Sequence, residues 1–275
     1  MQIKFSRVDE DFARFQLYPA SAAFANTLRR SMIAEVPSLA IDDVKVYDNT
    51  SALFDEMLAH RLGLIPIRTD LSCYVEREKC TCEGVGCPAC TAGFTMSVEG
   101  PRMVYSRDLI PEDPKAAPAV ETIPIVKLTK DQKVVLEAKA VVSTGKAHAK
   151  WQPTNACGYK NYPVITLDEQ CDACGLCVDE CPRQILEQKG SKVQVGEGKL
   201  EECSLCRLCE QACLNSGICE EPAIHVSDEK DRFIFVVESD GSLPAKEIVE
   251  RAIDQIRVRS ESLIEQVSEL SGGTV

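Results

Sequence analysis

Hydrophobic residues in the first part of the chain follow two different periods. Over residues 1–18 apolar and polar side chains alternate, which predicts a half-buried strand. Over residues 21–34 apolar side chains recur at every fourth position, which predicts a helix that ends before Pro37. A further strand is expected over residues 39–47 and a second helix over residues 50–63. That second helix should turn a stripe toward the core, formed by Leu53, Phe54, Met57, Leu58 and Arg61.

The rest of the chain predicts short strands and one long helix. Strands are expected over residues 95–106, 123–128, 134–142 and 233–237. A final helix over residues 244–270 carries apolar side chains at intervals of three, four and seven residues. This stripe is long for a domain of this size, so we expect it to pack against another chain. Packing against the chain's own sheet is the alternative.

Composition limits the class of protein. The chain has 275 residues, of which 44% are hydrophobic and 27% are charged, as in ordinary globular proteins. Its formal net charge of −12 argues against a main nucleic-acid-binding surface. The N-terminal residues lack the apolar stretch of a signal peptide, and the longest apolar run, residues 233–237, is far too short to cross a membrane. We therefore expect a soluble, cytoplasmic protein.

Cysteines are numerous and clustered. Of the 15 cysteines, five lie within residues 73–90 and nine within residues 171–219, and Cys157 stands alone. An odd number of cysteines without a secretion signal disfavours a disulfide framework. The clusters therefore predict metal ligands.

Eight of these cysteines form an internal duplication. The spacing C-x2-C-x2-C-x3-C begins at Cys171 and is repeated 32 residues later from Cys203. Three thiolates on such a loop can reach one [4Fe-4S] cube, and the fourth points toward the other cube. We predict one cluster bound by Cys171, Cys174, Cys177 and Cys213. We predict a second cluster bound by Cys203, Cys206, Cys209 and Cys181. Cys219 could replace Cys213, and residues 160–222 as a whole resemble bacterial two-cluster ferredoxins.

A second constellation has the spacing C-x-C-x4-C-x2-C and consists of Cys80, Cys82, Cys87 and Cys90. Four thiolates in tetrahedral geometry suit a structural Zn²⁺. A lone iron ion would fit the same cage, and the spacing does not separate the two metals. A site that holds no metal is the other alternative. Cys73 and Cys157 are expected to be small buried apolar residues.

The sequence offers no catalytic centre for nucleotide chemistry. It contains neither an Asp-x-Asp-x-Asp-like group for two metal ions nor a glycine-rich phosphate loop followed by Lys-Ser/Thr. Its three histidines, His60, His148 and His225, are far apart in the sequence. We expect no active site in this chain.

Several motifs, in this order, resemble one family. Residues Ala25–Arg30, Glu35–Pro37 and Leu62–Pro66 resemble the dimerisation domain of the α-like subunits of DNA-directed RNA polymerase, a nucleotidyltransferase built from many chains. Residues Cys80–Cys90 are similar to the zinc loop of archaeal and eukaryotic members, and Lys146–Pro153 to the segment that follows the insert-domain strands. The ferredoxin-like insertion is similar to that of archaeal members of the family.

This resemblance implies an α+β fold with inserted domains. A discontinuous dimerisation domain would comprise residues 1–44 and 223–275. A β-rich insert domain with the cysteine-rich loop would occupy residues 45–159, and a ferredoxin-like domain residues 160–222.

The resemblance also implies a non-catalytic role in assembly. The α-like subunit pairs with a small partner, subunit L in archaea, and the pair is a platform for the large catalytic subunits. The partner interface would comprise Phe24, Asn26, Leu28, Arg29, Arg30, Met32, Val249, Ile256, Leu263 and Val267. For the two arginines a solvated helix face is the alternative, although a guanidinium fork suits binding to carboxylates.

Two questions remain open at this point. A chain with two [4Fe-4S] clusters and an acidic surface could instead be a ferredoxin-type electron-transfer subunit of an oxidoreductase. In an assembly subunit the clusters could regulate assembly through their redox state or could act as static structural elements. Co-purification with other polymerase chains would distinguish the assembly subunit from the electron carrier.

Overall fold

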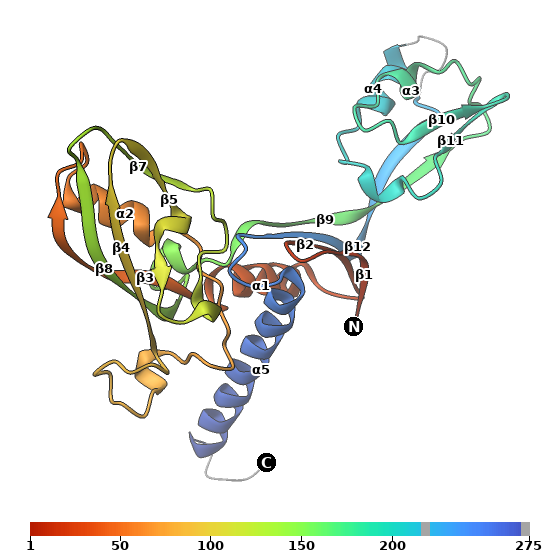
Figure 1. Ribbon diagram of the computed structural model, residues 1–275. Helices are drawn as coiled ribbons and strands as arrows, with labels where there is room; N and C mark the ends of the chain where they lie inside the picture. Colours follow the sequence, from red (N-terminus) through yellow and green to blue (C-terminus); the bar gives the residue numbers. More distant parts are fainter. Residues whose placement is uncertain (216–220, 271–275) are drawn as a thin grey trace. The chain divides into compact units, whose positions relative to one another are not determined.

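The computed structural model describes residues 1–215 and 221–270, and its contacts divide the chain into two compact units. Unit 1 consists of Met1–Ser6, Phe15–Ala25 and Tyr159–Phe235. Unit 2 consists of Arg7–Arg14, Asn26–Gly158 and Val236–Val275. Each unit is therefore assembled from three separate stretches of sequence (Figure 1).

A four-stranded sheet has the strand order β1-β2-β12-β9. Its strands are β1 (Gln2–Val8), β2 (Phe12–Tyr18), β12 (Ile224–Ser239) and β9 (Thr154–Leu167). Ala13, Phe15 and Leu17 of β2 are buried, as is the polar Gln16 between them. Within unit 1 the ring of Phe15 stacks on that of Phe235 with centroids 4.9 Å apart. The expected strand over residues 1–18 is thus two strands, and the expected strand over residues 233–237 is part of a 16-residue strand.

The cysteine repeat lies in unit 1 between β9 and β12 (Figure 1). Two short helices, α3 (Leu176–Asp179) and α4 (Leu208–Asn215), carry one part of each repeat. An antiparallel hairpin of β10 (Leu186–Lys189) and β11 (Lys192–Val195) separates them. The buried core of this region is small, and three of its nine members are cysteines.

Unit 2 contains an antiparallel sheet with the strand order β3-β8-β4-β6. Its strands are β3 (Pro37–Asn49), β8 (Lys133–Thr144), β4 (Thr91–Glu99) and β6 (Ile110–Pro111), and β5 (Arg102–Tyr105) pairs with β7 (Pro124–Leu128) in a second sheet. The apolar side chains of these strands pack with Leu58 and Leu62 of helix α2 (Asp55–Gly63) into one core. Short 3₁₀ segments of unit 2 are η1 (Arg77–Lys79), η2 (Ser106–Asp108), η3 (Pro114–Ala116) and η4 (Ala149–Trp151), and unit 1 contains η5 (Leu200–Glu202).

Within unit 2, helix α5 (Ala245–Leu270) contacts the part of helix α1 (Ala22–Ala34) that follows Ala25. The buried Ser31 hydroxyl donates a hydrogen bond to the backbone oxygen of Ala252 at 3.1 Å, and Arg259 pairs with Glu35. Only the first part of α5 is buried. None of the described helices has the length and apolar character needed to cross a membrane.

The second helix differs from the sequence prediction. It begins at Asp55 rather than near residue 50, because the side chains of Asn49 and Ser51 hydrogen-bond to nearby backbone N–H groups and hold residues 50–54 in a loop. The expected inward stripe is therefore wrong for Phe54 and Met57, which are 77% and 50% exposed. It is also wrong for Arg61, which is exposed and donates to the backbone oxygen of Ile125. The α+β class expected from the sequence is confirmed by the helices and antiparallel sheets.

Candidate metal centres and partner surface

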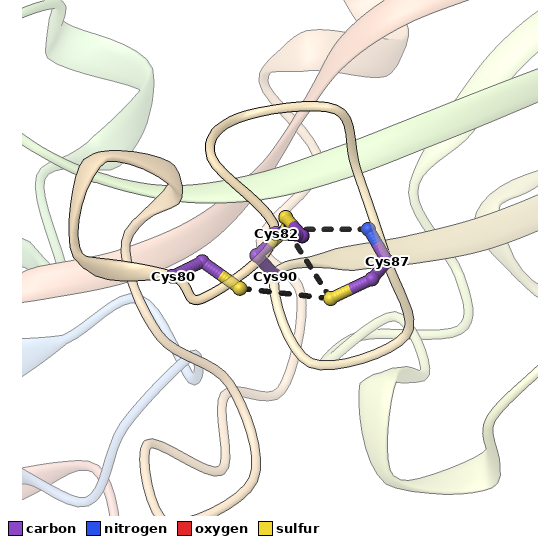
Figure 2. A group of neighbouring side chains, drawn as sticks. All are labelled: Cys80, Cys82, Cys87 and Cys90. Carbon is purple, nitrogen blue, oxygen red and sulfur yellow. Dashed lines mark hydrogen bonds between the residues drawn. The ribbon is translucent and has the colours of Figure 1, made fainter.

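Four cysteines of unit 2 converge on one point (Figure 2). Cys80 directly follows η1, and Cys90 directly precedes β4, so the two ends of the loop are held by regular structure. Glu83, Gly84 and Gly86 have left-handed backbone conformations with φ of 53°, 83° and 98°. These residues turn the chain tightly and bring the second pair of cysteines back toward the first.

The geometry of this four-cysteine cage fits a single tetrahedral ion. The Sγ atoms of Cys80 and Cys87 are 3.5 Å apart, those of Cys82 and Cys90 are 3.6 Å apart, and all four lie within 4.8 Å of one another. Zinc–sulfur bonds of about 2.3 Å at tetrahedral angles place the sulfurs about 3.8 Å apart. Within residues 1–215 and 221–270, no other group of three or more cysteine, histidine or acidic ligands is packed this closely.

Electrostatics within the cage favours a bound cation. The backbone N–H of Gly86 and the thiol of Cys80 donate to Cys82 and lower the pKa of its thiol to about 6. For Cys80, a hydrogen bond from the N–H of Cys82 also lowers the pKa of the thiol. The neighbouring thiols of Cys82, Cys87 and Cys90, together with burial, outweigh this effect, so the pKa of Cys80 is raised. Coordination to a metal ion deprotonates a thiol, so a cation bound in the cage would counteract the raised pKa of Cys80.

The eight repeat cysteines line two cavities of unit 1. The first is lined by Cys171, Cys174, Cys177 and Cys213 together with apolar Leu167, Val193 and Ile224. The second is lined by Cys181, Cys203, Cys206 and Cys209 together with Ile185, Leu186 and Val226. Each cavity thus takes three cysteines from one repeat and the fourth from the other. The binding of iron–sulfur clusters stays a prediction, and Cys219 lies outside the described residues.

The sequence duplication is repeated in the backbone. Ala173 and Leu205, each two residues after the first cysteine of its repeat, have φ of 56° and 58°. Gly175 and Arg207, two residues further on, have φ of 82° and 60°. The two loops therefore follow the same path, although a glycine supports the first turn and an arginine the second.

The thiols of the two cavities are buried and receive backbone hydrogen bonds. Burial raises the pKa of the Cys177 thiol to about 11, and neighbouring Cys171, Cys174 and Cys213 act in the same direction. Burial likewise raises the pKa of Cys209 to about 11. Backbone N–H groups of Ala223 and Leu205 donate to sulfurs of the two cavities at 3.3 and 3.4 Å, as is typical around iron–sulfur clusters.

Gly175 provides a local test of the first loop. Because its φ is +82°, substitution by alanine should lower the local stability of the loop by about 1 kcal/mol. The expected loss is conformational, since a Cβ atom there would meet only Gln188, at 3.4 Å. Hydrogen exchange of loop amides would measure it. The matched control is Gly158→Ala, because Gly158 has no left-handed φ and a Cβ atom there would meet nothing within 4 Å; equal effects of the two substitutions would contradict the prediction.

The residues predicted for a partner interface differ widely in exposure. Leu28, Met32 and Val249 are at most 1% exposed, so their side chains belong to this chain's own core rather than to a free surface. Leu263 and Val267 are 62% and 55% exposed on the second half of α5. The set also contains one more exposed residue, Arg30, and four half-buried residues, which are Phe24, Asn26, Arg29 and Ile256. Arg29 donates to the Asn26 side-chain oxygen at 3.1 Å.

The sequence prediction was also wrong for Cys73. It was expected to be buried, but it is exposed and contacts Asp70 and Lys115. The reason is that residues 70–74 form a hydrogen-bonded turn at the surface. Its partner Lys115 is 42 residues further along the chain, and no spacing motif connects the two. Cys157 is half-buried, and its sulfur lies 4.0 Å from the backbone oxygen of Arg29.

Together, these features define a mixed α/β protein with a single-ion cysteine cage and an exposed apolar helix face suited to pairing with another chain. Residues 14–259 match the family model described as the RNA polymerase Rpb3/Rpb11 dimerisation domain. The chain belongs to this family, which confirms the family expected from the sequence.

Curated relatives cover almost the whole chain. The chain is 48% identical to a Methanosarcina mazei protein and 46% identical to a Methanosarcina acetivorans protein, in each case over 98% of this chain and 99% of the relative. It is 41% identical to an Archaeoglobus fulgidus protein over 95% of this chain and 96% of the relative. All three relatives carry the name DNA-directed RNA polymerase subunit Rpo3.

Proposed function

We propose that the chain is a non-catalytic assembly subunit of an archaeal DNA-directed RNA polymerase and acts in the cytoplasm. It pairs with a small α-like partner of the subunit L type, and the pair is the platform on which the large catalytic subunits assemble. The observation that carries this proposal is the near full-length similarity to proteins named Rpo3. The family match over residues 14–259 supports the pairing step.

The second half of α5 is the proposed pairing surface. Its apolar side chains Leu263, Ile264, Val267 and Leu270 are between 55% and 89% exposed. Burial of an exposed leucine or isoleucine is worth about 1.5–3 kcal/mol, so a partner that covers this face gains considerable free energy. Charged residues on the same helix form ion pairs at i,i+3 and i,i+4 spacing, such as Arg257 with Asp254 and Glu261.

Substitutions on α5 test the pairing surface. The double variant Leu263→Asp, Val267→Asp should weaken binding of the small partner roughly 100-fold or more, because it removes two apolar contacts of about 1.5–3 kcal/mol each and buries charge. Titration of the partner against the full chain would measure the affinity. The control Glu261→Gln, Glu265→Gln alters the same turns without removing apolar side chains and should bind nearly normally. Equal affinity of the two double variants would contradict the proposed surface.

The metal content is part of the proposal. The four-cysteine cage binds one structural Zn²⁺, and the two repeat cavities bind [4Fe-4S] clusters through the cysteines that line them. The geometry of the cage supports a single tetrahedral ion, and the paired cavities, buried thiols and N–H···S contacts support the clusters. The inserted ferredoxin-like domain over residues 160–222 and the discontinuous dimerisation domain on either side belong to the same proposal.

The two cavities also support an alternative function, that of a ferredoxin-type electron-transfer subunit. The relatives named Rpo3 favour assembly. An affinity-tagged full chain that recovers a small chain and two very large chains from its native cells would support the assembly subunit. Recovery without polymerase chains, together with rapid electron transfer to a flavoprotein acceptor, would support the carrier instead.

A further inference from the structure

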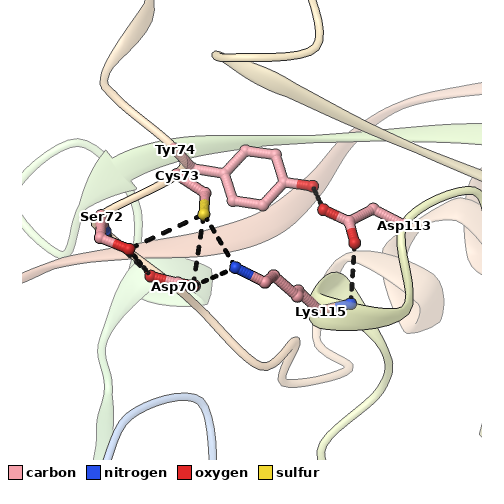
Figure 3. Close-up of polar contacts among 6 residues, drawn as sticks. All are labelled: Asp70, Ser72, Cys73, Tyr74, Asp113 and Lys115. Carbon is pink, nitrogen blue, oxygen red and sulfur yellow. Dashed lines mark hydrogen bonds and ion pairs between the residues drawn. The ribbon is translucent and has the colours of Figure 1, made fainter.

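Six residues outside the proposed metal centres form a second polar cluster in unit 2 (Figure 3). They come from the turn at residues 70–74 and the segment at residues 113–115. In the turn, the backbone N–H groups of Cys73 and Tyr74 both donate to the backbone oxygen of Asp70, each at 3.0 Å. In the other segment, the Asp113 carboxylate caps η3 by accepting from the N–H of Lys115 at 2.9 Å.

One partly buried hydrogen bond fixes the two segments relative to each other. The hydroxyl of Tyr74, a residue only 3% exposed, donates to the Asp113 carboxylate at 2.7 Å. Because Tyr74 is the neighbour of Cys73 and Asp113 is two residues from Lys115, this contact limits the relative movement of the cysteine and the lysine. The short distance between Cys73 and Lys115 is therefore held by the backbone of both segments and not only by the conformation of the flexible Lys115 side chain.

The side chains of Cys73 and Lys115 are in contact with each other, and both are exposed to solvent. The Lys115 Nζ lies 3.2 Å from the Cys73 Sγ and 3.1 Å from the Asp70 carboxylate, which in turn lies 3.3 Å from Sγ. Cys73 is exposed, and the Lys115 side chain is 57% exposed. Neither residue lines the four-cysteine cage or the two repeat cavities. The pair is therefore open to small oxidants and independent of the proposed metal ligands.

We propose that Cys73 and Lys115 form a modification site at which hydrogen peroxide produces a reversible sulfur–nitrogen crosslink. In the first step the Cys73 thiolate attacks one peroxide oxygen, an S–O bond forms, and the O–O bond breaks. Hydroxide leaves and takes up a proton as water, so that Cys73 becomes a sulfenic acid and peroxide is reduced by two electrons.

The second step is a condensation without further oxidation. Lys115 loses a proton to solvent, and its neutral amine attacks the sulfenic sulfur. An S–N bond forms, the S–O bond breaks, and the departing hydroxide takes up a proton as water, which leaves a sulfenamide. Two equivalents of a thiol reductant reverse the change by restoring the cysteine and the amine and forming one disulfide.

The observed geometry favours this condensation. An Nζ–Sγ separation of 3.2 Å lies within the range of about 3–3.5 Å in which reacting groups are already close to attack. Asp70 opposes the reaction, because its carboxylate stabilises the ammonium form of Lys115 through the 3.1 Å ion pair. Asp70→Asn keeps an oxygen that can accept from the N–H of Ser72 but removes this charge, so we expect it to crosslink several-fold faster than the parent chain.

Peptide mapping of the full chain tests the proposal. After treatment with hydrogen peroxide and alkylation of remaining thiols, proteolysis should yield one species that joins the Cys73 and Lys115 peptides, with the summed mass of the two reduced peptides less two hydrogen atoms. A thiol reductant should separate it. Cys73→Ser and Lys115→Arg should both abolish it, the latter because arginine keeps the cation but lacks a nucleophilic amine. Lys133→Arg is the matched control, since Lys133 is also paired with a carboxylate but is not in the cluster.

Two results would overturn the proposal. One is recovery of Cys73 from the treated parent chain only as sulfinic acid or as a disulfide, without the joined peptides. The other is a joined species that persists in Lys115→Arg, or one that retains an added oxygen atom between the two side chains.

Discussion

Substitution of Cys174 and Cys206 by serine should unfold the cysteine repeat over residues 171–213 while the sheets of unit 2 stay folded. These cysteines line different cavities, so the double variant removes one proposed ligand from each cluster. The core around them has nine buried members, of which three are themselves cysteines, and few large apolar side chains remain to hold it. With the proposed clusters bound, ligation energy would replace hydrophobic burial here, and its loss should cost several kcal/mol.

Oxygen-free preparations should show this directly. Iron, acid-labile sulfide and visible absorption should all fall, and amide exchange should become fast in residues 171–213 but stay slow in β4 and β8. Cys157→Ser is the control, because Cys157 is half-buried but lines neither cavity. A repeat that keeps its slow exchange without iron would refute the structural role. If large-subunit assembly is also unchanged without clusters, their proposed redox regulation of assembly fails as well.

Removal of metal from the four-cysteine cage should have the second large effect. Structural zinc in cysteine cages contributes about 10–16 kcal/mol of apparent binding free energy at neutral pH, and much of this becomes local folding energy. Without metal, the turn through Gly84 and Gly86 has little else to hold it, because both Cys82 and Cys87 are only half-buried. We expect residues 75–90 to lose their order, whereas Tyr74 stays packed in the core of unit 2.

Cys87→Ser and a chelator should give the same result. Metal analysis of the purified chain should show one zinc or iron ion per chain from this cage, and Cys87→Ser should lose it. Thermal unfolding should begin at a lower temperature, with the change in amide exchange confined to residues 75–90 and the adjoining start of β4. Ser72→Ala is the control, since Ser72 lies outside the cage. Full metal content in Cys87→Ser would show that the cage needs only three of these thiols.

The parts of the structure that could be predicted from sequence depend on local patterns. Ligands of the four-cysteine cage lie within 11 residues of one another, so their spacing alone brings them together. The grouping of the repeat cysteines also follows from spacing, because each loop repeats the same path. The helix α5 could be predicted because its apolar stripe persists over seven turns.

The parts that could not be predicted depend on distant contacts or on competition between weak local interactions. Leu28 and Met32 have the period of an interface stripe, but periodicity does not say whether the covering surface is in the same chain. The start of α2 is decided by hydrogen bonds of Asn49 and Ser51 that hold a loop where the composition also allows a helix. The proximity of Cys73 to Lys115 depends on the fold of unit 2, and no local pattern encodes it.

The exchange of the fourth cysteine between repeats has a consequence for synthesis of the chain on the ribosome. The first cavity requires Cys213 and Ile224, and the second requires Val226. A nascent chain that ends before Cys213 therefore lacks one thiol of the first set, and one that ends before strand β12 lacks Ile224 and Val226 of the cavity linings. Both clusters should consequently be inserted late, after most of unit 1 has emerged from the exit tunnel, and the two insertions should be mutually dependent.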